Sequence, residues 1–189
     1  MSRTSEGMKG LTASGVWLWR LVTPFALLLA VIVTAKPAGA QGILSGHVGV
    51  AFPLMNHTSA GGVSTTTTIS DSFNILFPFG IGVKPPGSPV VLDFEFVPEV
   101  HPSDRSVTLL VHPGVIKPLP KHWAVGLRAA FEVNQSSLGF TPLVNKNFPV
   151  PNYKVRWFVE GDLPVRFSQQ SSGINASSVG FALHLGLAF

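Results

Sequence analysis

The residues of this chain that could do chemistry are charged side chains at alternate positions of short apolar segments. Five acids and four bases fall on one parity of these segments, namely Asp93, Glu95, Arg128, Glu132, Lys154, Arg156, Glu160, Asp162 and Arg166. Buried charges are costly unless they are paired, so this near balance predicts a structural network of ion pairs. A lining that binds a ligand or conducts ions is one alternative, and a catalytic site is the other.

Two histidines share that parity in the first and the last alternating segments. His47 and His184 lie at similar distances from the same ends of these segments. If the two segments are neighbours, the imidazoles approach each other, and we expect a packed, hydrogen-bonded pair. A metal site needs at least a third ligand, and no H-x-x-x-H spacing is present. We therefore expect no metal and no cofactor.

Motifs for enzymatic chemistry are not apparent in the sequence. There is no G-x-S-x-G elbow, no readable Ser–His–acid order and no phosphate-loop spacing. The chain has no cysteine, which excludes disulfides and thiol chemistry. We expect a protein that is not an enzyme.

The elements that must position these residues are strands with one large apolar face. The last eleven residues, 179–189, put Val, Phe and Leu on one parity and Gly, Ala and His on the other. Eight such segments follow residue 41, at 42–54, 69–84, 90–100, 105–117, 123–133, 138–148, 153–167 and 179–189. A membrane-spanning strand needs roughly 9–11 residues, so the lengths fit. Two long polar loops are expected at residues 55–68 and 169–178.

Three features favour a lipid-facing surface over the water-facing surface of a soluble sheet. The central positions of the apolar parity carry no charge, and the opposite parity is mostly Gly, Ala, Ser and Thr. Aromatic residues cluster at the expected strand ends, with Phe52, Phe73, Phe131, Phe140, Phe167 and Phe181 toward one end and Trp123, Phe148, Tyr153 and Phe189 toward the other. These features predict an all-β fold, an eight-stranded antiparallel up-and-down transmembrane β-barrel. Pro78, Pro113, Pro142 and Pro164 oppose it, since each removes a ladder donor.

The first forty residues are predicted to be a cleaved signal peptide. Arg3, Lys9 and Arg20 precede an apolar run at 21–35, and Ala38-Gly39-Ala40 is a typical cleavage site. Residues 41–189 would then form the barrel domain. Cleavage removes four of the 13 bases and one of the nine acids, leaving nine against eight and a net charge of +1. That small charge argues against a nucleic-acid partner.

With its leader, its eight alternating segments and its terminal Phe189, the chain resembles the small eight-stranded outer-membrane barrels of the OmpA and OmpX type. The resemblance implies a location in the bacterial outer membrane and a barrel interior filled by charged side chains. It also implies that the last strand, ending in Phe189, is an assembly signal for the barrel assembly machinery.

The expected function is a structural or surface-interaction role in the envelope, through adhesion or envelope integrity. Its partners would be outer-membrane lipids and an extracellular ligand at loops 55–68 and 169–178. The alternatives are a barrel enzyme acting on lipids, a narrow pore, and a soluble periplasmic β-barrel or β-sandwich binding protein.

Overall fold

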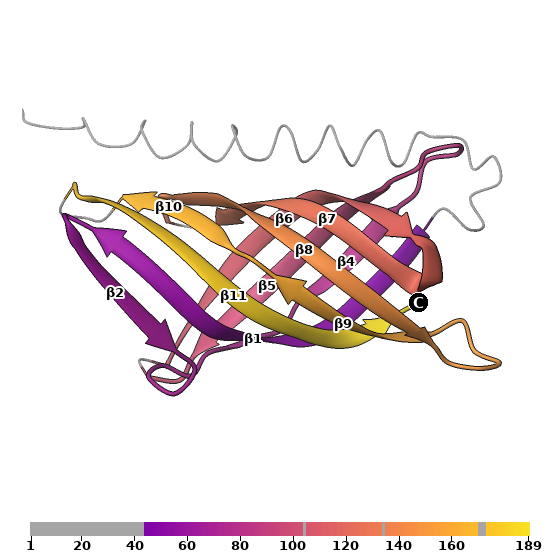
Figure 1. The fold of residues 1–189 in the computed structure, drawn as a ribbon, viewed down its shortest axis with the longest axis horizontal. Coiled ribbons are helices and arrows are strands. Elements are labelled where there is room, and N and C mark those ends of the chain that lie inside the picture. The colour runs from indigo at the N-terminus through magenta and orange to yellow at the C-terminus, as the bar shows by residue number, and fades with distance from the viewer. Residues whose placement is uncertain (1–43, 104, 134, 170–172) are drawn as a thin grey trace, which may run out of the picture. The chain divides into compact units, whose positions relative to one another are not determined.

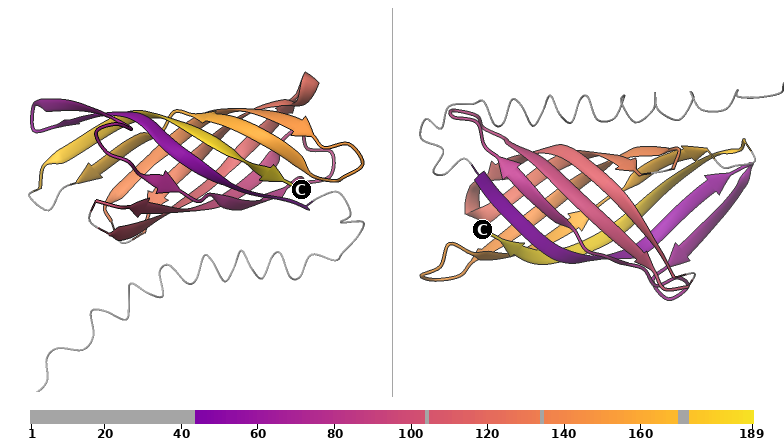
Figure 2. Two further views of the ribbon diagram at one scale, coloured as in Figure 1. Left: turned by 90° about the horizontal axis from the view of Figure 1, so that it is seen from below. Right: turned by 180° about the vertical axis from the view of Figure 1, so that it is seen from behind.

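The computed structural model describes residues 44–103, 105–133, 135–169 and 173–189 (Figures 1 and 2). The expected signal peptide, residues 1–40, lies outside the described residues. The described chain is all-β, with one 3-10 turn, η1 (Pro120–His122). Within it, no helix is both long enough and apolar enough to span a membrane.

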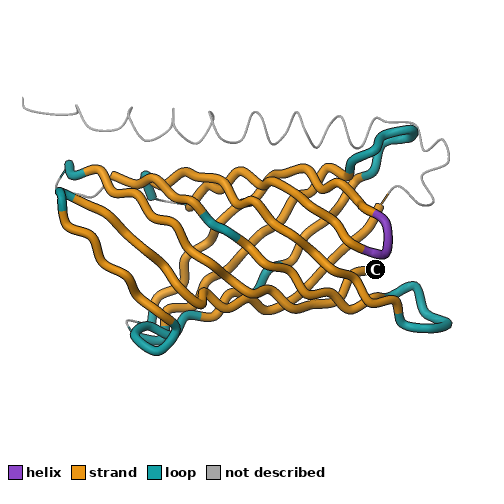
Figure 3. Tube along the Cα trace, in the orientation of Figure 1, coloured by secondary structure: helices purple, strands orange, loops and turns teal. Residues whose placement is uncertain are grey.

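Strands make up most of the described chain (Figure 3). In chain order they are β1 (Leu44–Ala60), β2 (Val63–Thr68), β3 (Ile75–Leu76), β4 (Phe79–Val83), β5 (Val91–His101), β6 (Ser106–Leu119), β7 (Trp123–Glu132), β8 (Ser137–Pro149), β9 (Arg156–Asp162), β10 (Val165–Gln169) and β11 (Asn175–Ala188). All of their pairings are antiparallel. The prediction of an antiparallel, up-and-down all-β fold is confirmed.

The path of paired strands leads back to the strand from which it starts. It runs from β1 through β4, β5, β6, β7, β8 and β9 to β11, and β11 pairs with β1. The β1–β11 register sets Val50 opposite Leu185 and continues to Ala60 opposite Ala176. The pairing is uneven, because β2 pairs with β1 alone, β3 is short, and β10 pairs with both β8 and β11.

Burial along the strands is the inverse of that in a water-soluble sheet. On β11, Val179 and Phe181 are 52% and 39% exposed, whereas His184 is 1% exposed. The same alternation recurs on the other long strands, where Leu92, Val115, Leu127, Val144 and Val159 are exposed and polar or small side chains are buried. The large apolar parity therefore faces outward, and the polar parity forms the buried face.

The strand registers bring some of the aromatic residues together near the two ends of the sheet. Phe148 lies opposite Trp157, and Trp123 lies opposite Lys146, two residues from Phe148. At the other end Leu138 lies opposite both Phe131 and Phe167. Phe52 and Phe73, both expected at that end, contact each other with ring centroids 6.4 Å apart, and Phe52 is half-buried.

Both expected polar loops differ from the structure. Residues 55–68 do not form a polar loop, because β1 continues to Ala60 and β2 pairs with it from Val63. Gly61 and Gly62, with φ of 57° and 82°, make the turn between them, and glycine adopts such angles at low cost. The expected loop at 169–178 is shorter, because β11 begins at Asn175.

Two of the four problematic prolines interrupt strands and two remain within them. Pro78 separates β3 from β4, and Pro164 separates β9 from β10. Their carbonyls still accept hydrogen bonds, from Gly49 N–H at 2.9 Å and Gly180 N–H at 2.8 Å. Pro113 stays within β6 and Pro142 within β8, the sixth expected segment, which pairs with β7 and β9.

Candidate functional site

The Arg128 guanidinium is the centre of a buried charge cluster built from three strands. Nε of Arg128 donates to Asp93 Oδ2 at 2.7 Å, and Nη1 donates to Glu160 Oε1 at 2.7 Å. Nη1 also lies 3.4 Å from Glu95 Oε2 and 4.0 Å from Asp162 Oδ1. Asp93 and Glu95 lie two apart on β5, as Glu160 and Asp162 do on β9, so strand alternation turns each pair to the buried face. All five of these side chains are buried.

Glycines on neighbouring strands make room for these long side chains. Gly114 lies opposite Arg128, and a Cβ atom there would come within 2.7 Å of Arg128 Cγ. Gly80 lies opposite both Glu95 and His47, and a Cβ atom there would come within 2.4 Å of His47 Cε1. The small residues of the buried parity are therefore a steric requirement of the cluster.

Three histidines surround the cluster, and each is hydrogen-bonded to a glutamate. His47 Nε2 lies 3.0 Å from Glu95 Oε1, and His112 Nδ1 lies 3.1 Å from Glu95 Oε2. His184 Nδ1 lies 3.2 Å from Glu160 Oε1. Glu95 therefore joins two imidazoles and Arg128.

The two histidines predicted to approach each other do lie close together. Their ring centroids are 6.3 Å apart, and Phe158 makes edge contacts with both, at 6.2 Å to His47 and 4.8 Å to His184. No hydrogen bond joins the two imidazoles in the described structure, because each is bound to a different glutamate. The expectation of a mutual hydrogen bond is wrong. In the β1–β11 register His47 faces Ala188, and His184 faces Ala51.

The cluster lacks three of the four bases predicted for it. Lys154 lies in the turn before β9 and Arg156 at its first residue, and both are exposed. Arg166 is half-buried to one side and donates to Thr141 Oγ1 at 3.1 Å and the Phe140 carbonyl at 3.2 Å. Glu132 is also half-buried and makes no ion pair with another described residue. Four buried carboxyl groups thus surround one guanidinium, where a balanced network was expected.

Glu95, Glu160 and His184 could offer ligand atoms to a metal, because such atoms lie within 4.8 Å of one another. The Arg128 guanidinium already occupies the space between the two glutamates, at 2.7 Å and 3.4 Å. His184 Nε2 has no hydrogen-bond partner in the described structure, but it faces the Gly49 backbone, where a Cβ atom would come within 2.6 Å. The arrangement therefore fits an ion-pair centre better than a metal centre.

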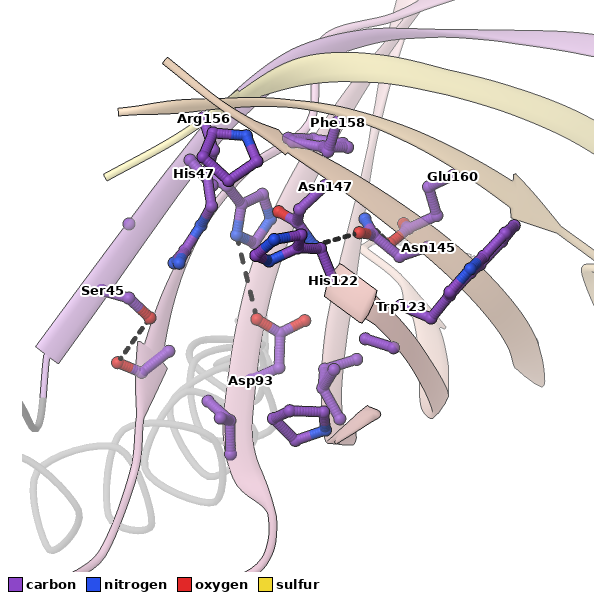
Figure 4. Close-up of a pocket in the computed structure, with 18 of the residues that line it drawn as sticks. Ser45, His47, Asp93, His122, Trp123, Asn145, Asn147, Arg156, Phe158 and Glu160 are labelled. Atoms are coloured by element: carbon purple, nitrogen blue, oxygen red, sulfur yellow. Dashed lines mark hydrogen bonds and ion pairs between the residues drawn. The ribbon is translucent and has the colours of Figure 1, made fainter. Parts of the chain in front are cut away.

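Two cavities lie on opposite sides of the cluster. The larger, about 740 Å³, is lined by His47, Asp93, Arg128 and Glu160 near the C-terminal end of β11 (Figure 4). The smaller, about 250 Å³, is lined by Glu99, His112, Glu132 and Arg166. No residue lines both, and the contacts from His47 through Glu95 to His112 connect one with the other.

Comparison with known proteins identifies no relative of this chain. No family model matches the chain, and no curated protein matches it.

Several residues of the site were not among those predicted for it. His112 is one of them, because its contact with Glu95 depends on the pairing of β5 with β6, which strand alternation does not specify. Asn145 donates to Glu160 Oε2 at 3.0 Å. At the far end of the β5–β6 hairpin, His101 Nε2 lies 3.1 Å from Thr108 Oγ1, and His101 Nδ1 lies 4.0 Å from Glu99 Oε1.

The terminal residue Phe189 closes the β1–β11 pairing. Its N–H donates to the Gly46 carbonyl at 2.9 Å, and Gly46 N–H donates to its carbonyl at 2.8 Å. The ring lies over Gly46, where a Cβ atom would come within 2.5 Å of Phe189 Cε2. The side chain is 60% exposed, so most of its apolar surface is accessible.

Proposed function

We propose that this chain is an outer-membrane protein, an eight-stranded β-barrel similar in architecture to the OmpA and OmpX type. The observation that carries the proposal is the inverted burial of the sheet, with large apolar residues exposed and charged residues buried. In water such a continuous apolar surface would favour aggregation, whereas lipid solvates it. The return of the pairing path to β1 supports closure, which removes most sheet edges.

The buried cluster supports a structural role for this barrel. Arg128 cross-links β5, β7 and β9, and the cluster lies between the two cavities. We propose that the cluster fixes strand register and obstructs an open pore. The protein then serves envelope integrity or adhesion and is not an enzyme.

The surface for adhesive contacts would be the β1–β2 hairpin and the connection between β10 and β11. The hairpin carries Ser and Thr side chains along β2, and most of them are exposed. A hydrogen-bonding surface of this kind suits a polar extracellular ligand. The adhesive surface expected as a loop at residues 55–68 is thus proposed to be a hairpin.

Cell fractionation tests the location. We expect the protein in the outer-membrane fraction, released only by detergent and migrating faster on a gel before heating than after it. The signal peptide would be absent from this material, which N-terminal sequencing beginning at Gln41 would show. Recovery in the soluble periplasm without detergent would overturn the proposal.

Hydrolysis of an acyl ester is the second candidate function, favoured by one set of contacts. Thr108, His101 and Glu99 have the order of a nucleophile, a base and an orienting acid. The acid is less well placed, because Glu99 lies 4.0 Å from His101 and accepts a hydrogen bond from Asn74 at 3.2 Å. Esterase activity lost in both Thr108→Val and His101→Ala would favour this candidate, and unchanged lipid chemistry in both variants would exclude it.

A further inference from the structure

The larger cavity separates negative charge at its floor from positive charge at its mouth. Its floor holds Asp93 and Glu160, which are 4% and 3% exposed. Its mouth is lined by Lys121, Lys154 and Arg156, all of which are exposed. These three cations make no ion pair with another described residue. A ligand entering the cavity therefore meets basic groups first and acidic groups last.

Among the described residues, no hydrogen bond joins Asp93 Oδ1 to another group, although it forms a longer ion pair with His47. Asp93 Oδ2 accepts from Arg128 Nε at 2.7 Å, but the nearest charged partner of Oδ1 is His47 Nδ1, at 3.9 Å. That separation exceeds hydrogen-bonding distance. Figure 4 shows the Asp93 side chain directed toward His47 within the cavity. A buried carboxylate oxygen in this position can accept a hydrogen bond from a donor in the cavity.

The charge of the surrounding cluster strengthens its attraction for a cation. Asp93, Glu95, Glu160 and Asp162 contribute four carboxyl groups, and Arg128 contributes one guanidinium. Four carboxyl groups thus face one guanidinium, so acidic groups outnumber basic groups at the floor of the cavity. A simple cation is nevertheless repelled at the mouth, and a simple anion is repelled at the floor.

We propose that this cavity binds a small zwitterion with an ammonium group at one end and a carboxylate at the other. The ammonium donates to Asp93 Oδ1, and the carboxylate lies at the mouth beside Lys154 and Arg156. The walls of the cavity include Trp123 and Phe158, which offer apolar contact to the carbon chain between the two charged groups. The volume of about 740 Å³ lies within the range of small-molecule sites.

Three probes of equal chain length test the charge requirement. The full protein, extracted in a non-ionic maltoside detergent, is titrated by calorimetry with γ-aminobutyrate, butylamine and butyrate at low ionic strength. We expect γ-aminobutyrate to bind at least about tenfold more tightly than either singly charged probe. The proposal is overturned if a singly charged probe binds equally well, or if the folded protein binds none of the three.

Substitutions test which residues hold the two ends. Asp93→Asn should weaken γ-aminobutyrate binding by about tenfold to a hundredfold, because a charge-assisted hydrogen bond is lost. Arg156→Gln, at an exposed position outside the cluster, should weaken it by about fivefold. The matched control is Lys117→Gln, an exposed base on β6 that does not line the cavity.

If Asp93→Asn does not fold, the comparison of Arg156→Gln with Lys117→Gln still tests the proposal. Weaker binding in Arg156→Gln but not in Lys117→Gln supports the proposal. Equal affinities in these two variants contradict it.

Discussion

Arg128 Nη1 lies 2.7 Å from Glu160 Oε1, and this ion pair joins β7 to β9 although β8 lies between them in the sheet. The contact with Asp93 likewise joins β7 to β5 across β6. Backbone hydrogen bonds hold only neighbouring strands together, so these side-chain contacts supply a second set of links. They constrain the curvature of the sheet and the register of strands that do not pair.

Replacing Arg128 with Leu should strongly destabilise the fold. It leaves Asp93 and Glu160 buried without their cation, at a cost of about 3–5 kcal/mol. Urea unfolding of the protein in lipid vesicles measures the change. Arg156→Leu removes the same charge from an exposed position and should change stability by no more than about 0.5 kcal/mol. Similar values for the two variants would show that the cluster does not stabilise the protein.

A methyl group added at Gly49 should also destabilise the protein. The new Cβ atom would lie 2.4 Å from the Leu185 carbonyl oxygen and 2.6 Å from His184 Nε2, and overpacking of this kind costs about 1–3 kcal/mol. Thermal unfolding measures the effect of Gly49→Ala. Gly161→Ala is the matched control, since its Cβ atom would have no neighbour nearer than 3.6 Å. A larger loss of stability in the control would contradict the packing described here.

The sequence was enough to predict which strand side chains point to the buried face, because side chains alternate between the two faces of a strand. Asp93, Glu95, Arg128 and Glu160 were placed on the buried parity, and the structure buries all four. The same rule failed for Lys154, because β9 begins at Arg156 and alternation has no meaning in the turn before it. Contacts between strands, such as His112 with Glu95, depend on register and curvature, which alternation does not specify.

The hairpin of residues 55–68 was missed although its signals are present in the sequence. Gly61-Gly62 is a typical two-residue hairpin turn, and the threonines of β2 have high strand propensity. The polarity of the segment favoured a loop because both faces of β2 are polar. A strand of this kind lacks the apolar alternation by which the other strands were recognised.

Removing the terminal aromatic ring should reduce assembly more than stability. Phe189→Ala keeps the backbone bonds to Gly46 but removes the exposed ring that we propose is recognised during insertion. We expect less folded protein in outer-membrane fractions, measured as the heat-modifiable band. Phe148→Ala removes another exposed aromatic residue from the same end of the sheet, 48% exposed against 60% for Phe189, and serves as the control. Equal yields of folded Phe189→Ala and wild-type protein would contradict the assembly role.

The turn after β2 should respond to acid through Asp71. Thr68 donates to this carboxylate from its backbone N–H and its hydroxyl, each at 2.8 Å, and these bonds lower the pKa of Asp71 below its ordinary value. A lowered pKa stabilises the turn above the ordinary value, and that stabilisation is lost as pH falls through the lowered one. NMR titration of the Asp71 carboxyl group should give a pKa below the ordinary value of an aspartate. An unshifted midpoint, with Thr68 N–H exchange insensitive to pH, would contradict these contacts.

Fluorescence quenching at the centre of the apolar face tests the membrane proposal most directly. The sequence contains no cysteine, so Leu127→Cys and Lys84→Cys each provide a single labelling position for protein in lipid vesicles. Leu127 lies on the exposed apolar parity, and Lys84 is an exposed residue directly after β4. We predict that a fluorophore at position 127 is quenched by brominated acyl chains and not by aqueous iodide, and that the reverse holds at position 84. Quenching by iodide at position 127 would show that this face meets water and would contradict a transmembrane barrel.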